Sequence, residues 1–195
     1  MDEEAIVKEI LSIPYRCYIC ERLDRIEIDY ISEIQYQVTR NNNVKSDLLA
    51  KGFCNYHFWT ISFLTTPEAV ASMGIILIEN NSTQSNSCLI CDHLKTKEAE
   101  LVNEFVKDAP IATSKDSDQS GRRFCQPHFR LIMKHLDGEI AVYFSNIQKL
   151  HNEQLLMELK SFVEKRNSRH ERDKNEKTSW WRAVEKIVGR KGTVT

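Results

Sequence analysis

The stretch FCNYHF, residues 53–58, and its near copy FCQPHF, residues 124–129, each hold a cysteine and a histidine three positions apart. Each stretch follows a CxxC pair, CYIC at 17–20 and CLIC at 88–91, and the four stretches together contain all 6 cysteines of the 195-residue chain. Cysteines that recur in one order and spacing predict two copies of one structural unit.

A constant separation of 71 residues relates the two copies, as it does Cys17 and Cys88. The same separation relates the remaining cysteines and the histidines of the two phrases, with no gap in the register. We therefore expect a tandem duplication in three sections that pack as one globule. These sections are repeat 1 at 14–80, repeat 2 at 85–151, and a C-terminal extension at 152–195 with a basic tail.

The composition favours helices, because the chain has only 6 glycines and 4 prolines and 28% of its residues are charged. Apolar residues at spacings of three and four predict a helix that begins after CYIC and stops at NNN, residues 41–43. The equivalent helix after CLIC is expected to be shorter and to end in a polar loop at 108–121. The apolar residues behind these two helices are Leu23, Ile26, Tyr30, Ile34, Val38, Leu94, Leu101 and Phe105.

Later helices follow from similar signals. Both FCxxHF phrases are expected to open a helix, and Thr66-Pro67-Glu68 predicts the start of a further helix over 67–79. A long helix is expected from about 140 to about 165, followed by a polar linker at 164–178. A short helix over 179–192 carries Trp180, Val184 and Ile187 on one face. The predicted fold class is all-α, with duplicated zinc-clamped units, a long helix and a C-terminal helix docked by its tryptophans.

Cysteine and histidine at these spacings are ligands for a soft divalent ion. A CxxC pair lies on one tight turn, and residues at i and i+3 share one face of a helix, so each pair can point at one ion. Three thiolates with one imidazole suit tetrahedral Zn²⁺, and we expect two zinc ions per chain. Pairing within each copy predicts one set of Cys17, Cys20, Cys54 and His57, and a second of Cys88, Cys91, Cys125 and His128.

Other interpretations of the cysteines remain open: free buried thiols, disulfides within each CxxC pair, or an iron–sulfur cluster. The first requires no fixed spacing, the second is rare in the cytosol, and the third seldom uses a histidine. His93 has no counterpart in the first copy, where Arg22 occupies the equivalent position. We expect His93 at the surface or beside a ligand.

The predicted sites favour a structural role. Four protein ligands leave no open position for water or substrate, and HExxH, HxE, phosphate-loop and G-x-S-x-G motifs do not occur. We therefore expect no enzyme but a structural zinc protein that serves as a protein-interaction or regulatory module. Two alternatives stay open: a thiol-based redox sensor, and a nucleic-acid-binding protein using residues 160–195, which hold 11 Lys/Arg against 5 Asp/Glu.

The acidic start MDEEAIVKEI predicts no secretory signal, and no apolar run approaches the 18 residues of a membrane span. We expect a cytoplasmic protein, and the sequence leaves its oligomeric state undetermined. The motifs CxxC-x-L and GFCxxHF, with the late WWRA at 180–183 and Gly189, resemble a family of helical prokaryotic proteins described as a domain of unknown function. This resemblance implies a helical prokaryotic protein and no particular activity. The second copy departs from it at Arg123, where the first has Gly52.

Overall fold

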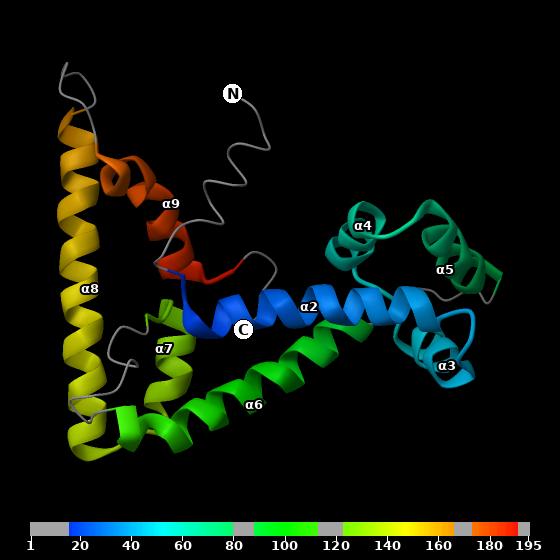
Figure 1. Cartoon of the computed structure of the whole chain (residues 1–195), viewed down its shortest axis with the longest axis horizontal. Helices are drawn as coiled ribbons and strands as arrows, with labels where there is room; N and C mark the ends of the chain where they lie inside the picture. The colour runs from blue at the N-terminus through cyan, green and yellow to red at the C-terminus, as the bar shows by residue number, and fades with distance from the viewer. Residues whose placement is uncertain (1–15, 80–87, 113–122, 166–172, 191–195) are drawn as a thin grey trace. The chain divides into compact units, whose positions relative to one another are not determined.

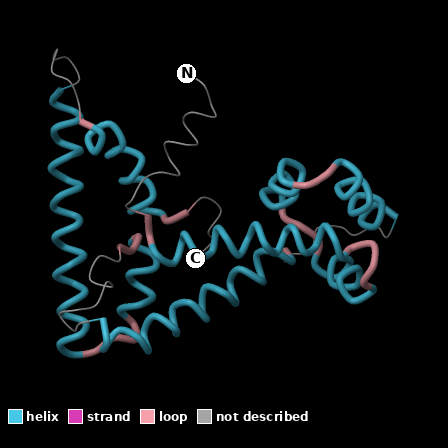
Figure 2. Tube along the Cα trace, viewed as in Figure 1, coloured by secondary structure: helices cyan, strands magenta, loops and turns pink. Residues whose placement is uncertain are grey.

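A computed structural model describes residues 16–79, 88–112, 123–165 and 173–190, and the regular secondary structure in these ranges is helical (Figures 1 and 2). Among them, strand-like pairing is limited to an isolated bridge between Cys17 and Arg123. The all-α fold class is thus confirmed. In chain order the helices are α2 (Tyr18–Gln37), α3 (Asn42–Lys51), α4 (Asn55–Leu64), α5 (Pro67–Glu79), α6 (Leu89–Ala112), α7 (Gln126–Met133), α8 (Gly138–Glu164) and α9 (Lys174–Val188).

Three pairs of helices begin at equivalent positions of the two sequence copies. The starts of α2 and α6, of α4 and α7, and of α5 and α8 are each 71 residues apart. The helices expected after both FCxxHF phrases, over 67–79 and to about 165 are all present. The common register agrees with a duplication, which itself stays a prediction.

Helix α3 was missed by the sequence analysis, which took NNN at 41–43 as a stop. The side chain of Asn41 accepts a hydrogen bond of 2.9 Å from the backbone N–H of Asn43, so Asn41 is the N-cap of α3. Asparagine is among the preferred N-cap residues because its side chain satisfies a free N–H of the first turn. The triplet therefore begins a helix, whereas α2 has already ended at Gln37.

Helix α6 is longer than α2, 24 residues against 20, so the expectation of a shorter second helix was wrong. The helix continues through 108–112, which the sequence analysis assigned to a loop, and holds Pro110 inside its last turns. Leu101, Phe105 and Ala109 form a buried stripe at a spacing of four. This packing outweighs the helix-breaking tendency of proline. The remainder of the predicted loop, 113–121, lies outside the described residues.

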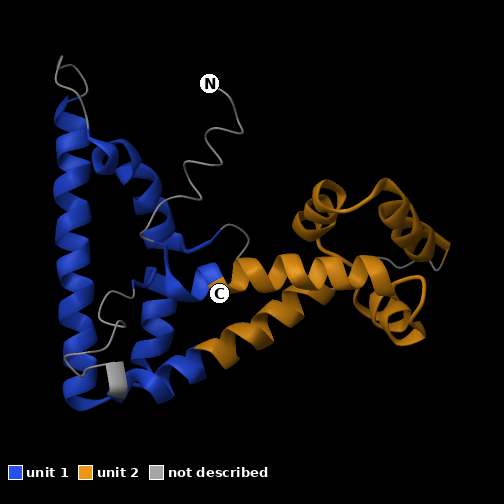
Figure 3. Cartoon of the chain, in the orientation of Figure 1, with its two compact units in different colours: residues 1–21, 102–195 blue, residues 22–101 orange. Residues whose placement is uncertain are grey.

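The chain divides into two compact units rather than one globule (Figure 3). Unit 1 comprises residues 1–21 and 102–195, and unit 2 comprises 22–101. The divisions fall within α2 and α6. The units therefore do not coincide with the sequence copies, whose ranges stay a prediction, and unit 1 contains parts of both copies.

Each unit has its own apolar core. In unit 1 the ring of Phe105 lies edge-on to Phe124 and Phe144, with centroids 4.9 and 5.2 Å away. In unit 2, α3 and α4 both pack on α5, and the core includes Leu48 and Met73, neither exposed to solvent. These cores hold the ends of the helices from which the metal-ligand candidates project.

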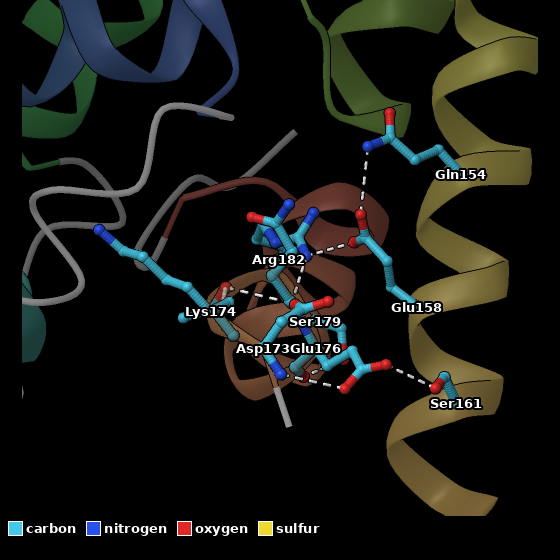
Figure 4. Close-up of polar contacts among 10 residues, drawn as sticks. Gln154, Glu158, Ser161, Asp173, Lys174, Glu176, Ser179 and Arg182 are labelled. Atoms are coloured by element: carbon cyan, nitrogen blue, oxygen red, sulfur yellow. Dashed lines mark hydrogen bonds and ion pairs between the residues drawn. The ribbon is translucent and has the colours of Figure 1, made fainter. Parts of the chain in front are cut away.

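Helix α9 packs on α8 and α7, but through a polar face (Figure 4). Its buried residues are Glu176, Ser179 and Arg182. Glu176 accepts hydrogen bonds of 2.6 Å from Ser161 of α8 and from Lys165. Arg182 pairs with Glu158 of α8. Because every one of these buried groups has a partner, burial of the polar face is not penalised.

The expectation that α9 docks by its tryptophans was therefore wrong. Trp180, Val184 and Ile187 are 50%, 52% and 56% exposed. The helix also starts at Lys174, earlier than predicted, because Asp173 and Glu176 form a capping box. Period and composition located the helix, but they could not show that the side facing the body is the charged one.

Candidate metal centres

The eight predicted ligands lie in two clusters of four. Site A is formed by Cys17, Cys20, Cys125 and His128, and site B by Cys54, His57, Cys88 and Cys91. Within each cluster, one atom from each residue lies within 4.8 Å of the others. All ligands of site A belong to unit 1 and all ligands of site B belong to unit 2.

The pairing of the ligands differs from the sequence prediction. We expected each CxxC to join the CxxH of its own copy, and the structure instead joins CYIC to the second phrase and CLIC to the first. The two sites are consequently nested along the chain, because both halves of site B lie between the halves of site A.

Helix lengths explain why the predicted pairing fails. The 20 residues of α2 run about 30 Å, whereas the 10 residues of α3 return at most about 15 Å. By contrast, α4 and α5 contain 10 and 13 residues and are joined by a short turn, so their lengths of about 15 and 20 Å nearly match. A path out along α4 and back along α5 lets residues 88–91 return to residues 54–57. A residue count that ignores the helices cannot distinguish these two cases.

All four ligand pairs lie at the beginning of a helix. Cys17 and Cys88 immediately precede α2 and α6, and Cys54 and Cys125 are the N-caps of α4 and α7. The Cys54 Sγ accepts a hydrogen bond of 3.5 Å from the backbone N–H of His57. Helix N-termini favour negative charge. This placement, expected from the sequence, therefore stabilises thiolates.

Distances in site A fit one tetrahedral ion. The Nδ1 atom of His128 is 3.3, 3.4 and 3.1 Å from the sulfurs of Cys17, Cys20 and Cys125. The sulfurs of Cys20 and Cys125 are 3.8 Å apart. Around a tetrahedral Zn²⁺ with ordinary bond lengths, S···S is about 3.8 Å and S···N about 3.6 Å. The sulfurs are much too far apart for a disulfide, in which S–S is about 2.05 Å.

Site B has almost the same dimensions. The Nδ1 atom of His57 is 3.2, 3.4 and 3.3 Å from the sulfurs of Cys54, Cys88 and Cys91, and the sulfurs of Cys54 and Cys91 are 3.8 Å apart. The six cysteines are all free thiols. Two clusters with this donor set and spacing are each suited to hold a metal ion.

Electrostatics within the clusters call for a cation. Burial opposes ionisation of Cys88, but the hydrogen bond with His57 lowers the pKa of Cys88 to about 6. Burial raises the pKa of Cys91, and the nearby sulfurs of Cys88 and Cys54 raise it further. One thiolate thus hinders its neighbours from ionising, so three thiolates in one site require a compensating positive ion.

A buried glutamate supports the histidine of site B. The carboxylate of Glu27 lies with Oε1 3.4 Å from Nε2 of His57, and both side chains are almost fully buried. A carboxylate behind a ligand histidine orients the ring and strengthens its binding to metal. The sequence analysis missed Glu27. Its signal was an acid within the apolar spacing of Leu23, Glu27 and Ile31.

The end of helix α9 lies against site A. Gly189 has φ of +79°, and a Cβ there would be 3.4 Å from the Cys125 sulfur and 3.8 Å from that of Cys20. Lys186 donates a 2.7 Å hydrogen bond to the backbone oxygen of Phe124. Burial lowers the pKa of Lys186 to about 8, although the negative charges of Cys17 and Cys125 oppose that shift. As a cation, Lys186 offsets the net charge of −1 that three thiolates leave on a zinc ion.

The two sites differ in their access to solvent. All four ligands of site A are buried, whereas Cys54 and Cys91 of site B are partly exposed. His93 belongs to neither site, and its ring stacks on that of Tyr30 at a centroid distance of 3.7 Å. Site A is therefore the more protected cluster.

Comparison with known proteins gives no family assignment, since no protein-family model matches the chain and no significant match was found among curated proteins or solved structures. The resemblance carried by the cysteine motifs and WWRA therefore stays a prediction. Within the described residues, none of the helices has the length and apolar character needed to cross a bilayer.

Proposed function

We propose that the protein is a structural zinc protein whose two ions hold helix ends in place, and that it serves as a protein-interaction module in the prokaryotic cytoplasm. The observation that carries this proposal is the pair of Cys₃His clusters, each with four ligand atoms within 4.8 Å. Thiolate and imidazole donors in this number favour zinc over harder ions such as magnesium or calcium. When bound, zinc supplies cross-links between helix ends.

The ligand count supports a structural rather than a catalytic role. Catalytic zinc sites keep a position for water or substrate, whereas four protein ligands close the tetrahedron. Site A is also fully buried. A closed site in a unit of this size can supply much of its folding energy. We therefore assign no reaction to the zinc ions.

Helix α4 offers the surface on which we place the partner. Trp59, Phe63 and Leu64 are 61%, 80% and 53% exposed, and the rings of Trp59 and Phe63 stack at 6.1 Å. We call these three residues the α4 aromatic face. Because a fully buried aromatic side chain covers about 150–250 Å², the two rings alone expose roughly 200–350 Å². Exposed apolar patches of a few hundred Å² commonly mark interaction sites.

The fold does not impose this apolar face. In α7, whose start lies 71 residues after that of α4, the equivalent positions hold Arg130, Lys134 and His135, all exposed. The same place on a comparable helix is thus charged in one unit and aromatic in the other. A function of α4 that needs exposed aromatic side chains accounts for this difference.

Charge around α4 defines the kind of partner. Residues 52–79 contain no lysine or arginine, and their carboxylates are Glu68 and Glu79. A protein whose contact surface is apolar at its centre and basic at its rim therefore complements the α4 aromatic face. Nucleic acid does not, since its phosphates require cations.

A site-specific photo-crosslinker tests this surface. Placed at Phe63 it is expected to capture a partner that the same group at Lys134, the equivalent position in α7, does not. The captured protein, once purified, should bind the wild-type chain, and Phe63→Ser should weaken its affinity at least tenfold. Equal capture at both positions, or unchanged affinity of the Phe63→Ser variant, would refute the assignment. Elemental analysis showing no metal in the folded chain would refute the zinc proposal separately.

Internal contacts reduce the case for nucleic-acid binding through residues 160–195. Lys165 is paired with Glu176, Arg182 with Glu158, and Lys186 with a backbone oxygen. These cations are committed to the attachment of α9, which leaves fewer to bind phosphate.

A redox-sensing role is a second candidate, favoured by the partial exposure of Cys54 and Cys91 in site B. Hydrogen peroxide would take two electrons from the two thiolates, which join as a disulfide while the peroxide gains two protons and leaves as two waters. The bound zinc would then lose two ligands. Mild peroxide should therefore release one zinc per chain, reversibly with thiol reductant, and Cys54→Ser should abolish disulfide formation. Release of both ions together, or of neither, would contradict this role.

A further inference from the structure

Helix α9 presents an apolar arc on the side away from its buried polar face. Trp180, Val184, Ile187 and Val188 are 50% to 57% exposed and fall within about 100° of each other at 100° per residue. Such an amphipathic helix normally buries its apolar side. The arc is therefore a surface that lacks cover in the described part of the chain.

The chain enters the described structure at the edge of this arc. Arg16, the first described residue, forms an ion pair of 3.4 Å with Glu185 of α9. Residues 1–15 are therefore tethered within reach of the arc. Docking them within the same chain carries a much smaller entropic cost than recruiting a separate molecule.

The sequence of residues 1–15 complements the arc in its apolar pattern. Ile6, Ile10 and Ile13 are spaced by four and three, which is one face of a helix. Pro14 follows and separates this pattern from Arg16. The segment from Glu4 to Arg16 spans about 18 Å as a helix, and α9 from Lys174 to Glu185 spans about 16 Å.

Charge fixes the direction of the segment. Asp2, Glu3 and Glu4 lie at its far end, and Lys174 and Lys177 are exposed at the start of α9. A segment that leaves Arg16 beside Glu185 and runs antiparallel to α9 brings these acids to those lysines. It also brings them to the N-terminus of α9, where negative charge is favoured.

From these observations, we propose that residues 1–15 dock along the exposed arc of α9, antiparallel to it, with Ile6, Ile10 and Ile13 covering Trp180 and Val184. The occupant is this chain's own N-terminal segment, not a second copy or a separate protein. The proposal is independent of the α4 aromatic face, and of whether the sites hold zinc.

Accessibility of Trp180 tests the proposal in the full chain. In a Trp59→Phe/Trp181→Phe background, acrylamide quenching of Trp180 should rise at least twofold in the Ile6→Glu/Ile10→Glu variant. Lys8→Gln/Ser12→Glu is the matched control, because it changes the charge equally on the opposite face of the segment. Unchanged quenching in the isoleucine variant, or an equal rise in the control, would overturn the proposal.

Two further measurements separate the segment from other occupants. Light scattering should give a concentration-independent monomer through α9. If dilution exposes Trp180 in parallel with dissociation of a dimer, a second copy covers the arc and the proposal is overturned. Lys174→Glu/Lys177→Glu should also raise quenching, and Glu3→Lys/Glu4→Lys in the same chain should restore protection. Failure of this charge exchange to restore protection would refute the antiparallel placement. The metal content of each variant reports folding independently.

Discussion

The nested ligand pairing predicts how zinc is lost when two ligands are removed together. Sites A and B share no ligand, so Cys20→Ser should lower the zinc content from about two ions per chain to about one. Adding His128→Ala damages the same site and should leave about one ion. Adding His57→Ala instead removes site B as well and should leave none. Pairing within each copy would exchange the results of the two double variants.

The energetic magnitude follows from the same geometry. A structural zinc site contributes about 10–16 kcal/mol of apparent binding free energy at pH 7, comparable with or larger than the net stability of a domain, about 5–15 kcal/mol. Because all ligands of site A lie in unit 1, Cys20→Ser should unfold α7 and α9 and leave α4 and α5 protected.

Elemental analysis and peptide-resolved hydrogen exchange measure both consequences. His93→Ala is the control for histidine loss, since His93 lies two residues from Cys91 but belongs to neither cluster, and this variant should retain two ions. The reasoning is refuted if the Cys20→Ser/His128→Ala variant loses both ions while Cys20→Ser/His57→Ala keeps one. It is equally refuted if exchange increases uniformly in both units.

Three further changes have defined outcomes. Gly189→Ala should cost at least about 1 kcal/mol more in denaturant unfolding than Gly52→Ala, because both positions have positive φ but only Gly189 lies against site A sulfurs; equal losses would contradict a role beside the site. Glu27→Gln should weaken zinc binding at site B about 10–100-fold in chelator competition and leave site A unchanged. Arg182→Met should destabilise unit 1 by about 3 kcal/mol because it leaves a carboxylate of α8 without its partner. Lys177→Met, exposed on the same helix, should change stability by less than about 0.5 kcal/mol.

Helix positions could be predicted well where a local signal defines the start. Thr66-Pro67-Glu68 gave α5 over 67–79, since a first-turn proline and a cap act within one turn. The eight metal-ligand candidates could also be found, because cysteine and histidine spacing is a local property. Helix α3 was missed since an asparagine triplet can both end one helix and cap the next.

Properties that depend on long-range packing could not be predicted. Ligand pairing depends on the length and direction of the helices between the motifs, and two similar copies offer equally good motifs within and between them. The orientation of α9 depends on Glu158 and Ser161 of α8, which accept or donate hydrogen bonds to its polar face. No pattern within residues 174–188 reveals those partners.

The length of α2 has a consequence for the order in which the chain is made. During synthesis from the N-terminus, CYIC and the first FCxxHF phrase both exist before CLIC, so the first four thiol and imidazole ligands available are those of the wrong set. A rod of 20 helical residues separates them and discourages their capture of one ion. Site B becomes complete with Cys91, and at about 5–20 residues per second His128 follows about 2–7 s later. Cys17 and Cys20 therefore wait for their true partners, and α2 acts as a spacer against premature metal loading.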